Sequence, residues 1–126
     1  MREEKGKPVF VEKSDLFFNL SHCPYCVAAV VHDMPVGVDV ERNFRWNRRL
    51  ARRISTPEEF AFLNQIQDEG KRGLELNRLW CRKESVIKCS GDGLGVDLSV
   101  VPVLHMPGFR EYQDKQITLC TYVNAT

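Results

Sequence analysis

The sequence predicts an α+β domain in which two main helices pack on a small antiparallel sheet. Three observations lead to this fold class. Stretches with the two-residue periodicity of strands occur towards both ends of the chain, helical periodicity fills the middle, and turn-forming residues separate the stretches. At 126 residues the chain is most simply one domain, 1–126, which can bury about two thirds of its unfolded surface.

Three strands are expected first. Those at about 16–20 and 27–32 are joined by a His-Cys-Pro-Tyr-Cys turn, since proline favours turns, and a third strand follows at 36–41. We therefore divide the domain into an N-terminal hairpin region, 1–35, and a core, 36–126.

The third strand has a polar face and an apolar face. Val36, Val38 and Val40 alternate with polar or small residues, so the valines should share one side. Asp39 and Glu41 should then lie together on the other side.

Two helices are expected in the middle of the chain. Thr56 can cap a helix that begins with proline, and Glu59 can close a capping box, which predicts a helix over 57–67. Residues 68–73 should interrupt, and a second helix from about 74 should end at the glycines near 91.

The C-terminal part is rich in β-branched and aliphatic residues. Strands are expected at 96–104 and 116–123, separated by a loop that contains Met-Pro-Gly. We expect these two strands to form a closing antiparallel pair.

Two segments together suit a metal ion beside a phosphate. The predicted strand offers Asp39 and Glu41, while Trp80, Glu84 and Lys88 stand four apart and share one side of the second helix. Oxygen ligands of this kind suit Mg²⁺, and phosphoryl transfer needs such an ion together with cations and a base. The alternative is an exposed strand face and an ordinary surface ion pair.

Composition excludes several classes. The formal charge is +1, with 18 basic and 17 acidic residues, so no overall field indicates nucleic acid or membrane as a partner. The charged start is unlike a secretion signal, no run approaches membrane-spanning length, and five irregularly spaced cysteines do not resemble a secreted disulfide framework. We expect a cytoplasmic protein.

An arginine-rich stretch covers 42–53. It contains six arginines and no acidic residue, and its spacing would gather several arginines on one side of a helix. This is either a solvated basic face or a docking site for an acidic partner or a phosphate.

Five motifs occur in one order along the chain. They are Gly6-Lys7-Pro8, Phe18-Asn19-Leu20-Ser21-His22, Gly37-Val38-Asp39-Val40-Glu41, Trp80-x-x-Lys83-Glu84-Ser85-x-x-Lys88 and Gly91-x-Gly93-Leu94. Over residues 6–95 this order resembles the 4′-phosphopantetheinyl transferase superfamily, specifically the larger type that activates peptide synthetases and many carrier proteins.

The resemblance implies an Mg²⁺-dependent reaction. The phosphopantetheine arm of coenzyme A is transferred to a serine of an acyl or peptidyl carrier protein, and adenosine 3′,5′-bisphosphate is released. Asp39, Glu41 and Glu84 would hold the metal. Glu84 would also help to deprotonate the serine, Lys88 would stabilise the departing phosphate, and Trp80 is expected to be a packing residue.

The other motif residues are assigned to coenzyme A by the same resemblance. Lys7, Pro8, Ser21 and His22 match blocks that grip its nucleotide. Lys83 is expected either to contact phosphate or to be an exposed helical lysine.

The resemblance also suggests partners. Carrier proteins of this family tend to present an acidic helix, which could dock on the arginine-rich stretch 42–53. The larger type has two similar halves and this chain matches little of the first, so we expect a homo-oligomer, dimer or trimer, in which a second chain completes the coenzyme A site. The alternative is a non-catalytic relative that binds coenzyme A or a carrier protein.

Cys23-Pro24-Tyr25-Cys26 has the form of a glutaredoxin dithiol, but that chemistry needs a helix after the second cysteine and the sequence there predicts a strand. A single Cys-x-x-Cys also argues against structural zinc. Two incidental thiols in a turn remain, with a reversible disulfide beside His22 as the other reading.

Overall fold

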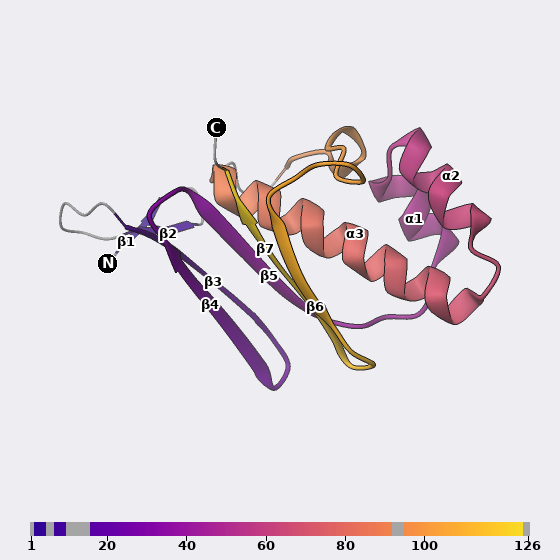
Figure 1. Cartoon of the computed structure of the whole chain (residues 1–126), viewed down its shortest axis with the longest axis horizontal. Helices are drawn as coiled ribbons and strands as arrows, with labels where there is room; N and C mark the ends of the chain where they lie inside the picture. The colour runs from indigo at the N-terminus through magenta and orange to yellow at the C-terminus, as the bar shows by residue number, and fades with distance from the viewer. Residues whose placement is uncertain (1, 5–6, 10–15, 92–94, 125–126) are drawn as a thin grey trace.

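The structure is a computed structural model that describes residues 2–4, 7–9, 16–91 and 95–124, with side chains described in the last two ranges (Figure 1). The described elements are β1 (Arg2–Glu4), β2 (Lys7–Val9), β3 (Phe17–Cys23), β4 (Cys26–His32), β5 (Val36–Arg42), α1 (Arg48–Ile54), α2 (Pro57–Gln65), α3 (Glu69–Ser90), a 3₁₀ turn (Leu98–Val100), β6 (Phe109–Gln113) and β7 (Ile117–Val123). The predicted α+β class is confirmed.

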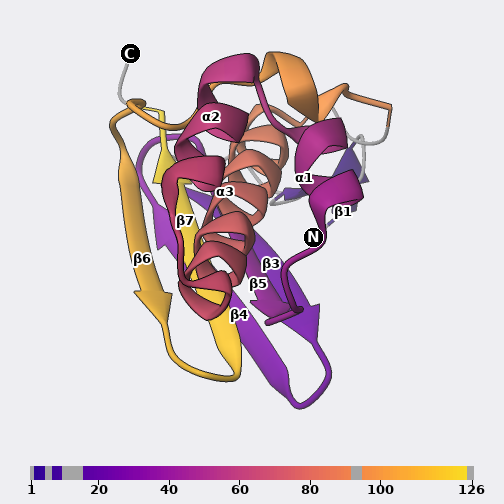
Figure 2. The same ribbon diagram turned by 90° about the vertical axis from the view of Figure 1, so that its right-hand side faces the viewer.

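The central sheet is antiparallel and has the strand order β5-β7-β6. Asp39 lies opposite Cys120 and Glu41 opposite Thr118 in the β5–β7 register. The long helix α3 covers one face of this sheet (Figure 2). The second predicted helix is therefore the element that faces the carboxylate strand.

The β3–β4 hairpin lies beside β5, on the side away from β7 (Figure 2). β3 and β5 belong to separate sheets, and side chains of β3 bond to the backbone of β5. Asn19 Oδ1 accepts a hydrogen bond from Val38 N at 3.0 Å, and Ser21 Oγ accepts one from Val40 N at 3.0 Å. These bonds satisfy backbone donors on the free edge of β5. They also bring Ser21 to the strand that carries Asp39.

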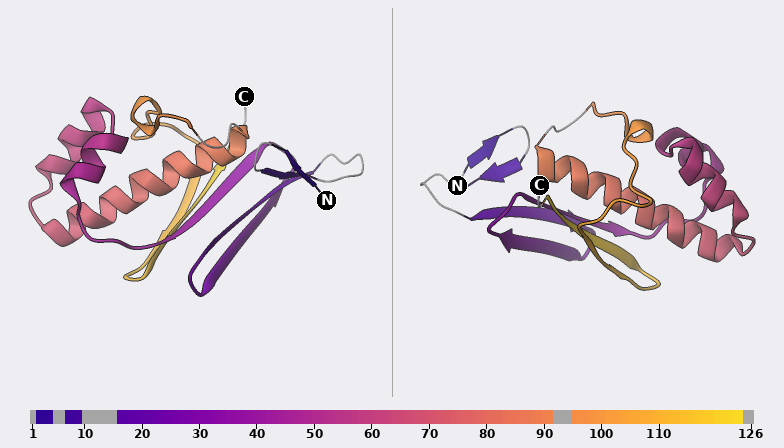
Figure 3. Two further views of the ribbon diagram at one scale, coloured as in Figure 1. Left: turned by 180° about the vertical axis from the view of Figure 1, so that it is seen from behind. Right: turned by 45° about the horizontal axis from the view of Figure 1, so that its top comes forward.

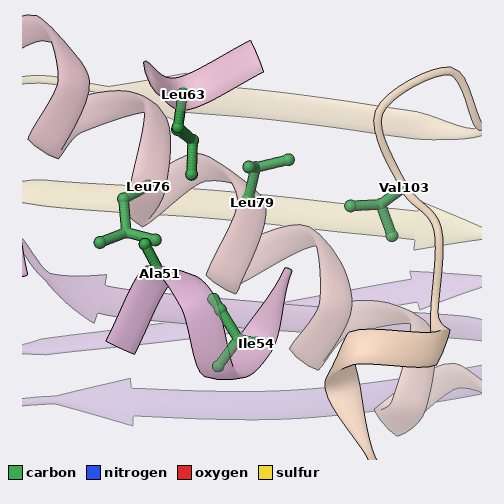
Figure 4. Packing of buried hydrophobic residues seen from close by; sticks show 6 residues of the cluster. All are labelled: Ala51, Ile54, Leu63, Leu76, Leu79 and Val103. Atoms are coloured by element: carbon green, nitrogen blue, oxygen red, sulfur yellow. The ribbon is translucent and has the colours of Figure 1, made fainter. Parts of the chain in front are cut away.

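A second layer of packing joins the three helices. Figure 4 shows its buried members, which are Ala51, Ile54, Leu63, Leu76, Leu79 and Val103. The two shorter helices gather at the N-terminal part of α3, while β1 and β2 lie near its C-terminal end (Figure 3). Burying a leucine, isoleucine or valine side chain contributes about 1.5–3 kcal/mol relative to exposure, so this cluster anchors one half of α3.

The predicted capping box is present at the start of α2. Thr56 Oγ1 accepts a hydrogen bond from Glu59 N, and Glu59 Oε1 accepts one from Thr56 N. Glu59 is nevertheless fully buried, and its second carboxylate oxygen accepts a bond from Val103 N at 2.8 Å. The cap residue thus also links α2 to the segment after α3.

The predicted strand over 96–104 is wrong. This segment contains the 3₁₀ turn Leu98–Val100, which Asp97 starts by accepting hydrogen bonds from the backbone and the hydroxyl of Ser99. Apolar character here serves packing on α3 rather than strand pairing. β7 pairs with β5 on one side and, in place of the expected strand, with β6 on the other, and β6 lies in a region expected to be loop.

The expected break between the helices is shorter than predicted. Asp68 caps α3, which begins at Glu69 and continues through Gly70 and Gly73. A side chain at Gly73 would lie 3.0 Å from Trp46 N, so this glycine permits a close backbone contact. None of the described helices is long and apolar enough to cross a membrane.

Candidate functional site

A glycine sets how close the carboxylate strand lies to α3. A Cβ atom at Gly37 would lie only 1.9 Å from Ser85 O and 2.6 Å from Cys89 N. The helix backbone therefore rests directly on β5. Asp39 and Glu41 share the face of Gly37, because alternate strand residues point the same way.

Asp39 is buried, with 3% of its surface exposed, and is contacted from several sides. Lys88 Nζ lies 3.0 Å from Asp39 Oδ1 and donates to Ser21 Oγ at 3.1 Å. The Ser21 hydroxyl also lies 3.4 Å from Asp39 Oδ1. The Cys81 thiol donates to the other carboxylate oxygen at 3.3 Å.

Burial raises the pKa of Asp39, and the Glu84 carboxylate acts in the same direction, against the attraction of Lys88. Burial also raises the pKa of Glu41 to about 7, with the charge of Asp39 as the next cause. For Glu84 the pKa is raised by burial and by Glu41, while Lys88 opposes the shift. The three carboxyl groups therefore act on one another as a single electrostatic cluster.

The helical row meets the strand at two levels. Trp80 Nε1 donates a hydrogen bond to Glu41 Oε1 at 3.2 Å, and Lys88 contacts Asp39. Glu84, half-buried, stands on the same helix face between these two contacts. The carboxylate strand and the helical row therefore lie together. Trp80 packs against the apolar cluster of the helices and also orients Glu41.

The donor set fits a hard divalent ion, because three carboxylates face a single ammonium and leave an excess of negative charge. Within 16–91 and 95–124, no group of three His, Cys, Asp or Glu side chains is arranged to hold a metal ion as it stands. The Lys88 ammonium occupies the position beside Asp39 that a metal ion would need. A metal would therefore require Lys88 to move.

Lys83 is placed differently from either expectation. Its side chain is fully buried and pairs with Glu59 at 2.7 Å. The ammonium also donates to Leu98 O at 2.8 Å and Val101 O at 2.7 Å. All three donors are thus used inside the protein, which leaves none for a phosphate, and Lys83 is neither a phosphate contact nor an exposed lysine.

Ser21 and His22 lie on opposite sides of β3. Ser21 is buried against Asp39 and Lys88, whereas His22 is exposed. The side chains of Lys7 and Pro8 lie outside the described residues, as do Gly6, Gly93 and Leu94 of the same motifs. Of the two expected nucleotide-binding residues on β3, whose side chains are described, Ser21 reaches the carboxylates and His22 does not.

Two contributors were missed from the sequence. Cys81 follows Trp80 on α3, and its thiol is fully buried against Asp39. Asn19 stands two residues before Ser21 and bonds to the same strand. The two-residue periodicity could have revealed Asn19, but no spacing rule identifies the thiol.

The arginine stretch forms an exposed surface. Its members are Arg42, Arg45, Arg48, Arg49, Arg52 and Arg53, and all are exposed. Two of them, Arg48 and Arg52, lie 5.3 Å from the centre of the Phe60 ring. Within the described part of the chain, none of the six forms an ion pair with a carboxylate.

Comparison with known proteins points to one family. A family model described as the 4′-phosphopantetheinyl transferase superfamily matches residues 35–122. The 4′-phosphopantetheinyl transferase Sfp of Bacillus subtilis (strain 168) is 30% identical over 117 residues, which cover 93% of this chain and 49% of that protein. The 4′-phosphopantetheinyl transferase HetI of Nostoc sp. is 32% identical over 110 residues, which cover 79% and 46%.

The 4′-phosphopantetheinyl transferase AcpT of Escherichia coli O157:H7 is 33% identical over 128 residues, which cover 94% of this chain and 63% of that protein. The chain thus spans about half to just under two thirds of the length of these relatives. The matched region contains β5, α3 and the carboxylate cluster between them. From this match, this chain belongs to the 4′-phosphopantetheinyl transferase superfamily.

Proposed function

We propose that this chain transfers the 4′-phosphopantetheine group of coenzyme A to a serine of an acyl or peptidyl carrier protein, releasing adenosine 3′,5′-bisphosphate. The observation that carries the proposal is the contact of Asp39 and Glu41 on β5 with the helical row that contains Glu84 and Lys88. Phosphoryl transfer depends mainly on such charge stabilisation and positioning.

Asp39, Glu41 and Glu84 are proposed to hold Mg²⁺. When bound, the ion would neutralise charge on the pyrophosphate of coenzyme A. The Lys88 ammonium is half-exposed, so it can leave Asp39 and donate to a phosphate oxygen, stabilising charge on the leaving group. Glu84 is proposed as the base, because a carboxyl with a raised pKa accepts a proton effectively near neutral pH.

The experiment that tests this proposal mixes the chain with coenzyme A, Mg²⁺ and several apo carrier proteins. Mass spectrometry should show the phosphopantetheine adduct on at least one carrier. Glu84→Gln and Asp39→Ala should each reduce the rate by about two orders of magnitude or more. Glu69→Gln, at an exposed position in the first turn of α3, is the matched control and should keep the rate. Full activity in both site variants would refute the assignment.

The second candidate is binding without transfer. The observation behind it is that, in residues 16–91 and 95–124, no three carboxylates are arranged to hold a metal ion and the Lys88 ammonium stands beside Asp39. Calorimetric titration with coenzyme A, together with the adduct assay, separates the two candidates. Binding with no adduct on any carrier would support the non-catalytic alternative.

We also propose that Lys7, Pro8, Ser21 and His22 contact the coenzyme A nucleotide. The support is their motif order together with the position of Ser21 beside Lys88. His22→Ala should weaken coenzyme A binding without changing the fold, as measured by calorimetry and circular dichroism. Unchanged affinity would remove His22 from the site.

A further proposal is that the chain self-associates as a dimer or trimer that completes this site. Apolar side chains of the β3–β4 hairpin are available for contact, with Val27 76% and Val31 59% exposed. Sedimentation equilibrium would measure the oligomeric state, and a strict monomer with full activity would contradict self-association.

We also propose that the reaction takes place in the cytoplasm, since all five cysteines are free thiols.

A further inference from the structure

The tip of the β3–β4 hairpin brings two thiols face to face. Cys23 and Cys26 are direct partners in the antiparallel register and close a turn made by Pro24 and Tyr25. Both cysteines are free and half-buried. The Cys23 thiol donates a hydrogen bond to Pro24 O at 3.8 Å, within the turn itself. The two cysteines are therefore cross-strand neighbours before any reaction occurs.

The backbone geometry suits a bond between them. Residues directly opposite in an antiparallel pair have Cα atoms about 4.5 or 5.5 Å apart, and disulfides span Cα separations of about 4.4–6.8 Å. Tyr25 has φ of 67°, an uncommon value for a residue other than glycine, and its side chain is fully exposed. Because Cys23 and Cys26 are directly opposite in the hairpin, their side chains lie on the same face of it. The exposed Tyr25 side chain takes no part in holding them there.

We propose that Cys23 and Cys26 form a reversible dithiol–disulfide pair, oxidised by low-molecular-weight disulfides such as oxidised glutathione. One protein thiolate attacks the glutathione disulfide, forming a mixed disulfide and releasing one glutathione thiolate. The second protein thiolate attacks the protein sulfur of that mixed disulfide, closing the Cys23–Cys26 bond and releasing the second glutathione. Two protein thiols are oxidised, and one glutathione disulfide is reduced to two glutathiones that take up the two protons.

The surroundings make the pair a substrate of thiol exchange rather than a catalyst. The residues after Cys26 form β4, so neither thiol lies at a helix N-terminus that would stabilise a thiolate. Burial raises the pKa of the Cys23 thiol, with the neighbouring Cys26 as the next cause. Exchange should therefore accelerate as pH rises and the thiolate fraction increases.

The bond should also be easy to reduce again. It closes a loop of four residues, and the entropic stabilisation from a disulfide grows with loop length. An exposed disulfide with little structural benefit has a higher reduction potential than a buried structural one. The other cysteines, Cys81, Cys89 and Cys120, are buried and should stay reduced in the native protein.

The test uses the whole chain in a series of reduced and oxidised glutathione mixtures, followed by acid quenching, alkylation in denaturant, intact mass measurement and peptide mapping. We expect the loss of two hydrogen atoms, three alkylated cysteines in place of five, a linked peptide that contains 23–26, and full reversal by excess reduced glutathione. Cys23→Ser and Cys26→Ser should instead retain glutathione on the remaining thiol. Cys89→Ser is the matched control and should still form the linked peptide.

Three results would overturn the proposal. They are a wild-type chain that keeps five reduced thiols throughout the series, one that accumulates glutathione adducts without the internal bond, and one whose cysteines link between chains on a non-reducing gel. The readout counts thiols and does not depend on transfer activity, so this inference and the proposed function succeed or fail separately.

Discussion

At the scale of single residues, Asp39 is the group around which the site is arranged. Lys88, Ser21 and Cys81 contact its two oxygens, and the carboxylate is almost completely buried. A buried charge of this kind is tolerated only when it is paired or hydrogen-bonded. The stability of the site therefore depends on which cation stands beside Asp39.

Lys88→Met tests this dependence. Removing the ammonium leaves the carboxylates without their cation, and we expect the free energy of unfolding to fall by about 1–3 kcal/mol in the absence of divalent ions. If Mg²⁺ binds where we propose, it should raise the melting temperature of Lys88→Met more than that of the wild type. Thermal unfolding with and without Mg²⁺ measures both effects, and an equal response of the two proteins would count against competition between Lys88 and the metal.

Lys83 gives a second prediction at this scale. Lys83→Met leaves Glu59 buried and unpaired and removes a donor from two backbone carbonyls, so stability should fall by about 3–5 kcal/mol. Lys83→Met combined with Glu59→Gln removes both charges and should recover part of the loss. Urea unfolding of the two single variants and the double variant measures the coupling. Simple additivity would show that the pair is not the cause.

At the scale of elements, the contact of α3 with β5 decides whether the site exists. Gly37 permits the close approach, because any side chain there would collide with the helix backbone at Ser85 and Cys89. The helix also contacts β6, because Arg78 and Arg82 of α3 both pair with Glu111 of that strand. The helix is thus held on the sheet at β6 as well as at β5, where the carboxylates lie.

Gly37→Ala should separate β5 from α3. We expect a loss of about 1–3 kcal/mol or more from overpacking, together with weakened metal-dependent stabilisation. Gly70→Ala is the matched control, since a side chain there meets only the carboxylate of Asp68 at 3.2 Å, and alanine favours a helix. Thermal and urea unfolding compare the variants, and equal stability of the two would contradict the proposed close contact.

Glu111 predicts a pH dependence of stability. Burial alone would raise the pKa of its carboxyl, but hydrogen bonds from Arg82 and Arg78 outweigh this and lower it. A lowered pKa in the folded state contributes stability above the unfolded pKa of about 4.3 and loses it as pH falls through the folded value. Glu111→Gln should be less stable at neutral pH and show a shallower loss in acid, as measured by urea unfolding across pH.

At the scale of the whole molecule, charge is distributed unevenly although the net charge is +1. The exposed arginines of α1 and the preceding loop have no carboxylate partners in the described residues, whereas the carboxylates of the site are gathered between β5 and α3. If Mg²⁺ binds at the carboxylates as we propose, this separation would suit a phosphate-bearing substrate at the metal and an acidic carrier protein on the arginine surface.

Arg49→Glu with Arg53→Glu tests carrier docking. If an acidic carrier protein binds here, the KM for the carrier should rise several-fold and the rate should become less sensitive to salt, while kcat is kept. Arg110→Glu, an exposed position on β6, is the control and should leave KM unchanged. Steady-state transfer assays at two ionic strengths measure these quantities, and an unchanged KM in the double variant would remove this surface from the interface.

Several features could be read from the sequence because they depend on short-range chemistry. The capping box at Thr56 and Glu59 needs only a spacing of three, and the shared face of Asp39 and Glu41 needs only strand alternation. The row of Trp80, Glu84 and Lys88 on α3, spaced four residues apart, follows from helical periodicity in the same way. The proposed site was therefore predicted as two halves.

The sequence by itself determined the capping box of α2, the polar face of β5 and the row of Trp80, Glu84 and Lys88 on α3, since backbone periodicity and caps act over a few residues. Only the tertiary structure decided that Lys83 is buried, that β6 rather than 96–104 pairs with β7, and that Ser21 and Cys81 contact Asp39. These outcomes join residues distant in the chain, and they follow from competition for burial and hydrogen bonds that no local spacing records.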